Sequence, residues 1–272
     1  MSVSKAVEAH YNKPQLEQLI LEALSRAGHD GQHLKPMDLA PVDEFHLGAL
    51  ESTQAMAPFM KLWPGMHLLD VGCGIGGPAR YFAAEHQCRV TGVDLTEQYV
   101  RTAENLTRLT GLGDRVSFRR ASALELPFEA GSFDGAYMIH VGMNVADKAG
   151  VFREVARVLK PGGLFTIYDI LRTAEGKLQF PVPWAISEET NFMSDLYTYT
   201  EALHSAGFAM KHERRRREFA IEFMQRMVAR AAAPPVLGIH LLMGDQAPIM
   251  LKNVFAAVQA GIIEPVELVA AR

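Results

Sequence analysis

The chain has 272 residues, of which 49% are hydrophobic and 21% charged, and its formal net charge at pH 7 is −4. This length suffices for one sizeable α/β domain with additions or for two small domains. Because the charges are spread along a slightly acidic chain, the composition argues against a nucleic-acid partner or an anionic membrane surface and favours a small-molecule substrate.

The cysteine content and the first residues indicate the cellular compartment in which the protein is expected. Only Cys73 and Cys88 occur, and MSVSKAVEAHYNKPQ lacks the charged and then apolar layout of a signal peptide. No apolar run approaches the roughly 18 residues of a membrane span. We therefore expect a cytoplasmic protein that does not enter a membrane. The sequence leaves the oligomeric state open, and a homodimer is one option.

The N-terminal segment reads as a helical cap. Apolar residues recur at helical spacing between residues 16 and 24, the proline-rich stretch LKPMDLAPVDEFHLG follows as a connector, and a second helix is expected near residues 50–61. We expect residues 1–47 to form this cap and residues 48–218 to form the core of the protein.

From residue 66 the pattern alternates between strand and helix. MHLLDV, CRVTGVDL, RVSFRRAS, FDGAYMIHV and LFTIYDI read as strands, with helices between most of them. Such alternation predicts right-handed crossovers and an α/β fold with a mostly parallel sheet covered on both faces. Ligands of such sheets bind at the carboxyl ends of the strands. Asp70, Gly77, Asp94, Ser122 and Asp169 should therefore surround one crevice.

The last third of the chain has a different pattern. A helix near residues 199–206 precedes the charged strand AMKHERRRREFA, and PVELVAAR reads as a closing strand. We expect residues 219–260 to form a helical insertion, and residues 261–272 to supply the final strand of the core. Neighbouring strand residues point to opposite faces, so the run Arg214 to Arg217 cannot form one flat RNA-binding patch and is expected in a solvated edge strand.

The stretch DVGCGIGGP indicates a binding loop. Gly72 suits a tight turn, Gly74 allows a close backbone approach, and the helix that follows presents unpaired N–H groups to an anion. The spacing also satisfies G-x-G-x-x-G, so a dinucleotide pyrophosphate and the carboxylate of an amino-acid-like cofactor both remain open. Asp70 would repel a pyrophosphate but could hold an ammonium group, and no Tyr-x-x-x-Lys pair occurs in the chain.

Four motifs in order extend this interpretation. LLDVGCGIGG, VTGVDLT, LPFEAGSFD and EVARVLKPGG, over about residues 66–210, resemble those of class I S-adenosylmethionine-dependent methyltransferases. DEFHLG, HVGMNVADK and PVPWA are similar to the small-molecule branch that includes sarcosine and dimethylglycine N-methyltransferase-like proteins. The resemblance implies a Rossmann-like, doubly wound, mostly parallel seven-stranded sheet with a helical N-terminal cap and a C-terminal helical insertion that together form a lid.

The resemblance also implies a cofactor site. It places the loop glycines along the methionine moiety with Asp70 near its amino group, Asp94 on the ribose hydroxyls, Leu95 against the adenine, and the serine and alanine of SA near the adenine amino group. Related proteins often carry an acid where Ser122 stands, which weakens that contact. Asp70 could instead cap a turn, Asp94 could be a surface carboxylate, and Cys73 could be a small loop residue without a further role. The expected set is Asp70, Gly72, Cys73, Gly74, Asp94, Leu95, Ser122, Ala123 and His140.

Methyl transfer needs a well-placed acceptor more than a large catalytic apparatus, although an N–H or O–H acceptor also needs a base. His140, at the end of the fourth strand of the core, is the candidate base, and otherwise shapes the pocket by hydrogen bonding. Asp169 could orient that imidazole or bind a substrate cation, or it could cap the next loop. No metal site is expected, because Asp169 is followed by Ile170 where metal-dependent relatives carry Asn, and no zinc-type spacing occurs.

The remaining candidates would contact the substrate. Trp184 could bind an amine-derived cation at the rim or be buried against the lid. Tyr11 and His46 belong to the N-terminal cap, and the alternative for both is that they only pack within the protein. The expected set is Tyr11, His46, Met143, Asn144 and Trp184. The sequence thus predicts methyl transfer from S-adenosylmethionine to a nitrogen or oxygen of a small metabolite. The alternatives are an NAD(P)-dependent oxidoreductase and a non-catalytic cofactor-binding protein.

Overall fold

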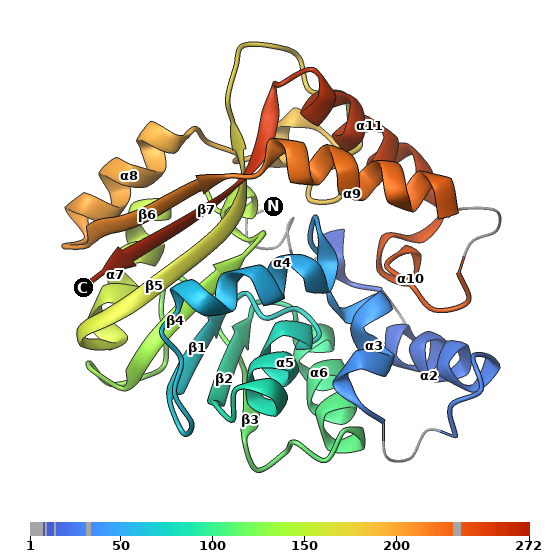
Figure 1. Ribbon diagram of the computed structural model, residues 1–272, viewed down its shortest axis with the longest axis horizontal. Coiled ribbons are helices and arrows are strands. Elements are labelled where there is room, and N and C mark those ends of the chain that lie inside the picture. The colour runs from blue at the N-terminus through green and yellow to red at the C-terminus, as the bar shows by residue number, and fades with distance from the viewer. Residues whose placement is uncertain (1–7, 9, 14, 31–33, 231–234) are drawn as a thin grey trace.

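A seven-stranded sheet forms the centre of the computed structural model, which describes residues 8, 10–13, 15–30, 34–230 and 235–272 (Figure 1). The strands are β1 (His67–Val71), β2 (Arg89–Asp94), β3 (Val116–Arg120), β4 (Phe133–Ile139), β5 (Leu159–Arg172), β6 (Ala209–Arg215) and β7 (Ile263–Ala271). Their order across the sheet is β3-β2-β1-β4-β5-β7-β6. Only β7 runs antiparallel to its neighbours, which confirms the predicted α/β fold with a mostly parallel sheet.

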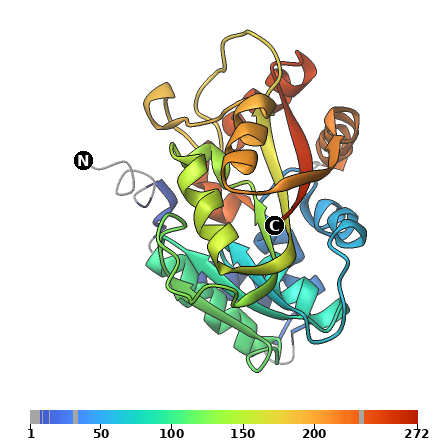
Figure 2. The ribbon, with the colours of Figure 1, turned by 90° about the vertical axis from the view of Figure 1, so that its left-hand side faces the viewer.

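Helices cover both faces of the sheet, as Figures 1 and 2 show. The helices are α2 (Leu16–Arg26), α3 (Pro36–Asp43), α4 (Ala49–Met56), α5 (Gly77–Glu85), α6 (Glu97–Leu109), α7 (Lys148–Val158), α8 (Leu196–Ser205), α9 (Arg217–Arg230), α10 (His240–Met243) and α11 (Ala247–Gln259). Helices α7 and α8 pack on one face through Phe152 and Leu203. Helices α5 and α6 pack on the other through Phe82 and Ala103. Burial on both faces explains why these strands read as continuous apolar runs.

The order of the strands locates the crevice. The chain moves outward from β1 to β3 and then returns to β4 on the other side of β1, so the loops after β1 and β4 diverge to opposite faces. A crevice therefore opens at the carboxyl ends of these two strands.

The N-terminal helices and the helices between β6 and β7 meet beside this crevice (Figure 1). Leu242 of α10 shares one buried apolar cluster with Leu16 of α2 and Leu39 of α3. Segments more than 190 residues apart in sequence thereby build a single cover, because no one of these short helices could bury its apolar face alone.

Two local expectations were wrong. The proline-rich connector contains α3: Pro36 occupies its first turn, where a missing N–H costs nothing, and the side chain of Asp38 accepts the backbone N–H of Lys35 at 2.8 Å. The helix expected over residues 50–61 ends at Met56 and continues only as a short 3-10 turn, Ala57–Phe59.

The arginine run does not form one solvated strand. β6 is an edge strand, as expected, but it ends at Arg215, and Arg216 is only 8% exposed. The Arg216 guanidinium lies 3.9 Å from the centre of the Phe219 ring, so α9 covers it. The expectation of a solvated face holds for Arg215 and is wrong for Arg216.

Among the described helices, none combines the length and the apolar character that a membrane crossing requires.

Candidate functional site

The loop between β1 and α5 needs glycine at its first position. Gly72 has a φ of +75°, and a Cβ added there would lie 2.4 Å from Cγ2 of Val141. The N–H of Gly72 donates to the carbonyl oxygen of Val93 at 2.8 Å, which holds the loop against the end of β2. Backbone conformation and close packing against the β4 side thus both exclude a side chain at residue 72.

Asp94 fastens the same loop from β2. Its Oδ2 accepts the N–H of Gly74 at 2.9 Å, and its Oδ1 accepts the N–H of Thr96 at 2.8 Å. Burial raises the pKa of Asp94 to about 6, and these two hydrogen bonds oppose the rise. The carboxylate is therefore held in one orientation at the mouth of the crevice.

Asp70 lies on β1 directly below the loop. It is 2% exposed. Burial raises the pKa of Asp70 to about 8, although the Tyr137 hydroxyl lies close enough to oppose the rise. No hydrogen bond of good geometry reaches its Oδ2 from the described residues. An unpartnered buried carboxyl oxygen is costly, so this atom is suited to bind a donor that the protein itself does not supply.

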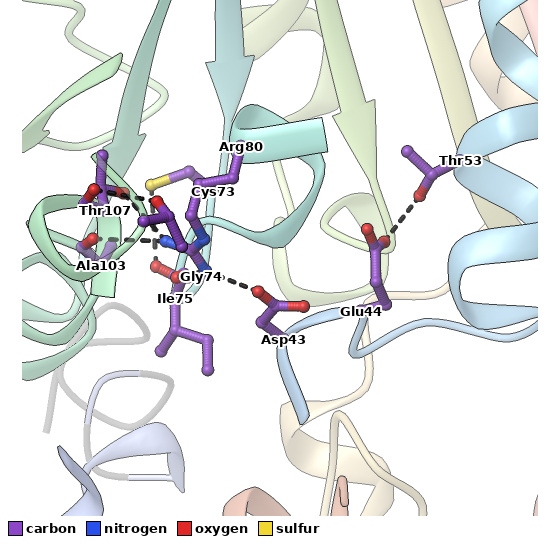
Figure 3. Close-up of polar contacts among 10 residues, drawn as sticks. Asp43, Glu44, Thr53, Cys73, Gly74, Ile75, Arg80, Ala103 and Thr107 are labelled. Carbon is purple, nitrogen blue, oxygen red and sulfur yellow. Dashed lines mark hydrogen bonds and ion pairs between the residues drawn. The ribbon is translucent and has the colours of Figure 1, made fainter. Parts of the chain in front are cut away.

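The end of α3 covers the start of α5 (Figure 3). A Cβ added to Gly77 would lie 2.4 Å from the carbonyl oxygen of Asp43, so glycine permits this close contact. Arg80 on α5 pairs with Asp43, 2.7 Å from Nη2 to Oδ2, and the same nitrogen donates to the carbonyl oxygen of Ile75 at 2.7 Å. Part of the positive end of α5, expected from sequence to face a cofactor anion, thus already faces a carboxylate.

A cavity of about 320 Å³ lies between this loop and the cap. Among the candidate catalytic, cofactor and substrate residues, all but Asp169 line it: Tyr11, His46, Asp70, Gly72, Cys73, Gly74, Asp94, Leu95, Ser122, Ala123, His140, Met143, Asn144 and Trp184. Gly77, also expected at the crevice, does not line it. The charged lining consists of Asp43, Asp70, Asp94 and Asp147, and no lysine or arginine of the described chain lines it. The cavity therefore favours a positively charged ligand.

Two histidines face each other in this cavity. His46 and His140 have their ring centres 5.8 Å apart, and His140 stacks on Tyr168 at 5.3 Å. Nε2 of His46 lies 2.9 Å from the carbonyl oxygen of Ala49, to which it can only donate. Burial lowers the pKa of His46 to about 4 and that of His140 well below its usual value. Both imidazoles are therefore uncharged near neutral pH.

The exception is Asp169, which does not line the cavity. Its Oδ2 accepts the N–H of Gly142 and the hydroxyl of Tyr199, each at 2.7 Å. These bonds tie Asp169 to the loop after β4 and to α8, so its Oδ2 does not orient the His140 imidazole, which is one of the expected roles. The alternative, that Asp169 caps the loop following its own strand, does not describe these contacts either, because Gly142 follows β4 and Tyr199 lies on α8.

Two of the expected substrate contacts have partners within the protein. Trp184 is 5% exposed, and its Nε1 donates to Oδ1 of Asn191 at 2.9 Å, so the alternative of burial against the lid applies. The hydroxyl of Tyr11 donates to Oδ1 of Asn144 at 3.1 Å, which joins the N-terminal segment to the loop after β4.

Sequence reasoning missed Asp43 and Phe45, which also line the cavity. The sequence offers only His46 of the stretch DEFH as a candidate, because the residues before it have the composition of a connector, whereas they form α3. In the part of the chain that the structure describes, no three His, Cys, Asp or Glu side chains gather in a way that could hold a metal ion.

Comparison with known proteins identifies the domain. Residues 69–167, from β1 to β5, match a family model described as a methyltransferase domain. A sterol 24-C-methyltransferase of Gibberella zeae is 41% identical over 110 residues, which are 40% of this chain and 29% of that protein. This chain contains a class I S-adenosylmethionine-dependent methyltransferase domain. The predicted family is therefore confirmed, while the chain spans only 28–40% of the length of the curated relatives it matches.

Solved structures support the fold of the methyltransferase domain and of its additions. Geranyl diphosphate C-methyltransferase from Streptomyces coelicolor A3(2) superposes with a TM-score of 0.73 over 100% of this chain and 98% of that one, at 18% identity. A candidate sarcosine dimethylglycine methyltransferase from Galdieria sulphuraria gives a TM-score of 0.67 over 82% and 85% of the two chains, at 21% identity. These identities establish a shared fold, and they confirm the predicted Rossmann-like architecture.

Proposed function

We propose that this protein transfers a methyl group from S-adenosylmethionine to a small molecule enclosed beneath its cap. The observation that carries the proposal is the charge of the cavity. Four aspartates and no lysine or arginine of the described chain line it, and Asp43 and Asp70 each keep a buried carboxyl oxygen without a partner. S-adenosylmethionine carries positive charge on its sulfur and on its ammonium group, so its charge is complementary to this lining.

The residues around the cavity fit each part of that cofactor. Asp94 is fixed by two backbone N–H groups and can accept the ribose hydroxyls. The loop from Gly72 to Gly74 lets the methionine moiety approach the backbone, and Asp70 offers its free oxygen to the ammonium group. We assign the adenine side to three residues at the ends of β2 and β3, namely Leu95, Ser122 and Ala123.

The same charges argue against an NAD(P)-dependent oxidoreductase. A dinucleotide pyrophosphate carries two negative charges, and the loop that would bind it lies between the carboxyl groups of Asp43, Asp70 and Asp94. Carboxylates that are ionised would repel the pyrophosphate, and protonated ones would offer no positive charge to hold it. The G-x-G-x-x-G spacing therefore does not make this loop a dinucleotide site.

The chain's own residues supply enclosure and a proton acceptor. When bound, S-adenosylmethionine supplies a methyl group on a positively charged sulfur, which leaves as a neutral thioether. His46 and His140 are uncharged near neutral pH, so each has one ring nitrogen free of a proton. The burial that lowers their pKa also weakens them as bases, so either could take up a proton only as charge develops on the acceptor. The cap, through Tyr11 and Phe45, excludes water from the same space.

A carbon acceptor is the second candidate. The curated relatives include enzymes named as sterol C-methyltransferases, and one matching structure is a geranyl diphosphate C-methyltransferase. Much of the cavity wall is apolar, with Phe45, Ile75, Met143 and Leu242 among its lining residues. Such a wall could accommodate an unsaturated hydrocarbon as well as a small amine or alcohol.

Two experiments test the proposal. Calorimetric titration should show binding of S-adenosylhomocysteine and none of NAD(H), and the reverse result would overturn it. A screen of cell-extract metabolites with S-adenosylmethionine carrying an isotopically labelled methyl group then identifies the acceptor and the atom that is methylated. Transfer to no metabolite, despite tight cofactor binding, would favour a non-catalytic binding protein.

A further inference from the structure

We infer that Asp43, on the cap, completes the ammonium subsite together with Asp70 on β1. This inference rests on the proposed function and adds to it a residue from outside the region that matches the methyltransferase family model. It means that the cap contributes directly to recognition of the cofactor's amino-acid tail, in addition to covering the cavity.

The two oxygens of Asp43 have different surroundings. Oδ2 pairs with Nη2 of Arg80 at 2.7 Å, whereas Oδ1 is buried and has no hydrogen-bond partner among the described residues. The residue is 5% exposed and lines the same cavity as Asp70. In Figure 3, one carboxyl oxygen of Asp43 is joined to Arg80 and the other points away from it. The ion pair thus orients the carboxylate and leaves one buried oxygen beside the cavity without a hydrogen-bond partner among the described residues.

The charges around this point do not balance within the protein. Asp43, Glu44 and Asp70 are at most 5% exposed, and Arg80, itself fully buried, is the arginine whose charge acts on all three. One guanidinium cannot neutralise three carboxylates, so burial raises the pKa of each of these acids and favours their protonated forms in the free protein. A bound ammonium group would supply positive charge in place of those protons and so favour the ionised carboxylates.

The hydrogen-bonding capacity also matches. An ammonium group has three N–H donors, and the unpartnered Oδ1 of Asp43 and Oδ2 of Asp70 can accept two of them. Glu44 belongs to the same acidic group but does not line the cavity, and its Oε2 already accepts the hydroxyl of Thr53 at 2.7 Å. Glu44 therefore provides a matched control: a neighbouring buried acid without access to the ligand.

The test compares two ligands that differ only in the amino group: S-adenosylhomocysteine and its analogue in which hydrogen replaces that group. Calorimetry with the full chain should show that the wild type prefers S-adenosylhomocysteine by about a hundredfold, as expected for two charge-assisted hydrogen bonds. Asp43→Asn should reduce this preference by about tenfold and leave affinity for the analogue nearly unchanged. Glu44→Gln should retain the wild-type preference.

The ratio of the two affinities separates the loss of one contact from general damage to the site. A distorted site would weaken the binding of both ligands alike and leave the ratio unchanged. Should Asp43→Asn fail to fold because Arg80 is left unpaired, the double variant Asp43→Asn/Arg80→Gln removes both charges and takes its place. A wild-type preference below about threefold, or an unchanged preference in the Asp43 variant, would overturn the inference. If the proposed function itself is wrong, the wild type should bind neither ligand, which distinguishes that result from the two outcomes above.

Discussion

The carboxylate of Asp94 accepts the backbone N–H of Gly74, with 2.9 Å between Oδ2 and the nitrogen, so the end of β2 fixes the loop that follows β1. This bond joins two motifs that lie 20 residues apart in sequence. It gives Asp94 two tasks, because the same carboxylate is our candidate for the ribose hydroxyls.

Replacement of Asp94 should therefore weaken cofactor binding. We expect Asp94→Ala to lower affinity for S-adenosylhomocysteine by about ten- to a hundredfold, since hydrogen bonds to a charged group contribute about 1.5–3 kcal/mol. Calorimetric titration measures the effect. Asp134 is the control, because its carboxylate accepts the N–H of His67 at 2.8 Å at the opposite, amino ends of the strands. Asp134→Asn should bind normally, and normal binding by Asp94→Ala would refute the ribose assignment.

The two loop glycines should differ in how well they tolerate alanine. Gly72 and Gly74 both have positive φ, +75° and +52°, but a Cβ at Gly72 would meet Val141 at 2.4 Å, whereas one at Gly74 would meet nothing within 4 Å. We expect Gly74→Ala to cost about 1 kcal/mol of unfolding free energy from backbone strain alone. Gly72→Ala should cost about 1–3 kcal/mol more because of overpacking.

Urea denaturation measures both variants, and a second substitution identifies the cause. Val141→Ala removes the methyl groups that a Cβ at residue 72 would strike. The double variant Gly72→Ala/Val141→Ala should therefore regain part of the lost stability. Equal stability of the two single glycine variants would show that the contact with Val141 is unimportant.

Much of the site could be predicted because β strands, glycine turns and strand-end carboxylates leave local patterns. Gly72, Asp70 and Asp94 each stand at a point where a buried strand ends, and the parallel topology brings such points together. This explains why the predicted cofactor residues lie around one cavity.

Residues whose role depends on distant partners could not be assigned in this way. The sequence suggests that Asp169 ends its strand as Asp70 and Asp94 end theirs, but β5 continues to Arg172. The Asp169 carboxylate is taken up by Gly142 and Tyr199, which no local pattern links to it. Asp43 reaches the cavity only because α3 packs against the start of α5, and that packing depends on contacts between segments more than 30 residues apart. The positions and partners of Asp169 and Asp43 therefore depend on tertiary contacts more than on local propensity.

The buried acidic partners of Arg214 and Arg215 also lie in a segment distant in sequence, and the two arginines differ in how much they should contribute to stability. Arg214 pairs with Glu267 at 2.6 Å, and Glu267 is fully buried, whereas the side chain of Arg215 is 56% exposed. Arg214→Ala should cost about 3 kcal/mol of unfolding free energy, because a buried carboxylate would lose its partner. Arg215→Ala should cost less, about 1 kcal/mol, because the exposed Arg215 side chain lies farther from its own buried partner, Glu264, at 3.3 Å.

Chemical denaturation of both variants tests this difference. The double variant Arg214→Ala/Glu267→Gln removes the stranded charge and should recover part of the loss. Equal costs for Arg214→Ala and Arg215→Ala would mean that the pair with Glu267 contributes no more than a surface contact.

The buried carboxyl of Asp70 should make the stability of the free protein depend on pH. Burial raises its pKa from 3.8 to about 8, so the folded chain holds a proton that the unfolded chain has released. The stabilisation from that proton is complete below pH 3.8 and is lost as the pH rises through about 8. Between pH 6 and pH 8.5, we expect the wild type to lose about 2 kcal/mol more unfolding free energy than Asp70→Asn, which cannot titrate. Asp43 and Glu44 titrate in both proteins, so comparing urea denaturation of the two isolates the share of Asp70. Parallel pH profiles would show that the Asp70 carboxyl is already ionised at pH 6, and an ammonium ligand would then bind without displacing a proton from it.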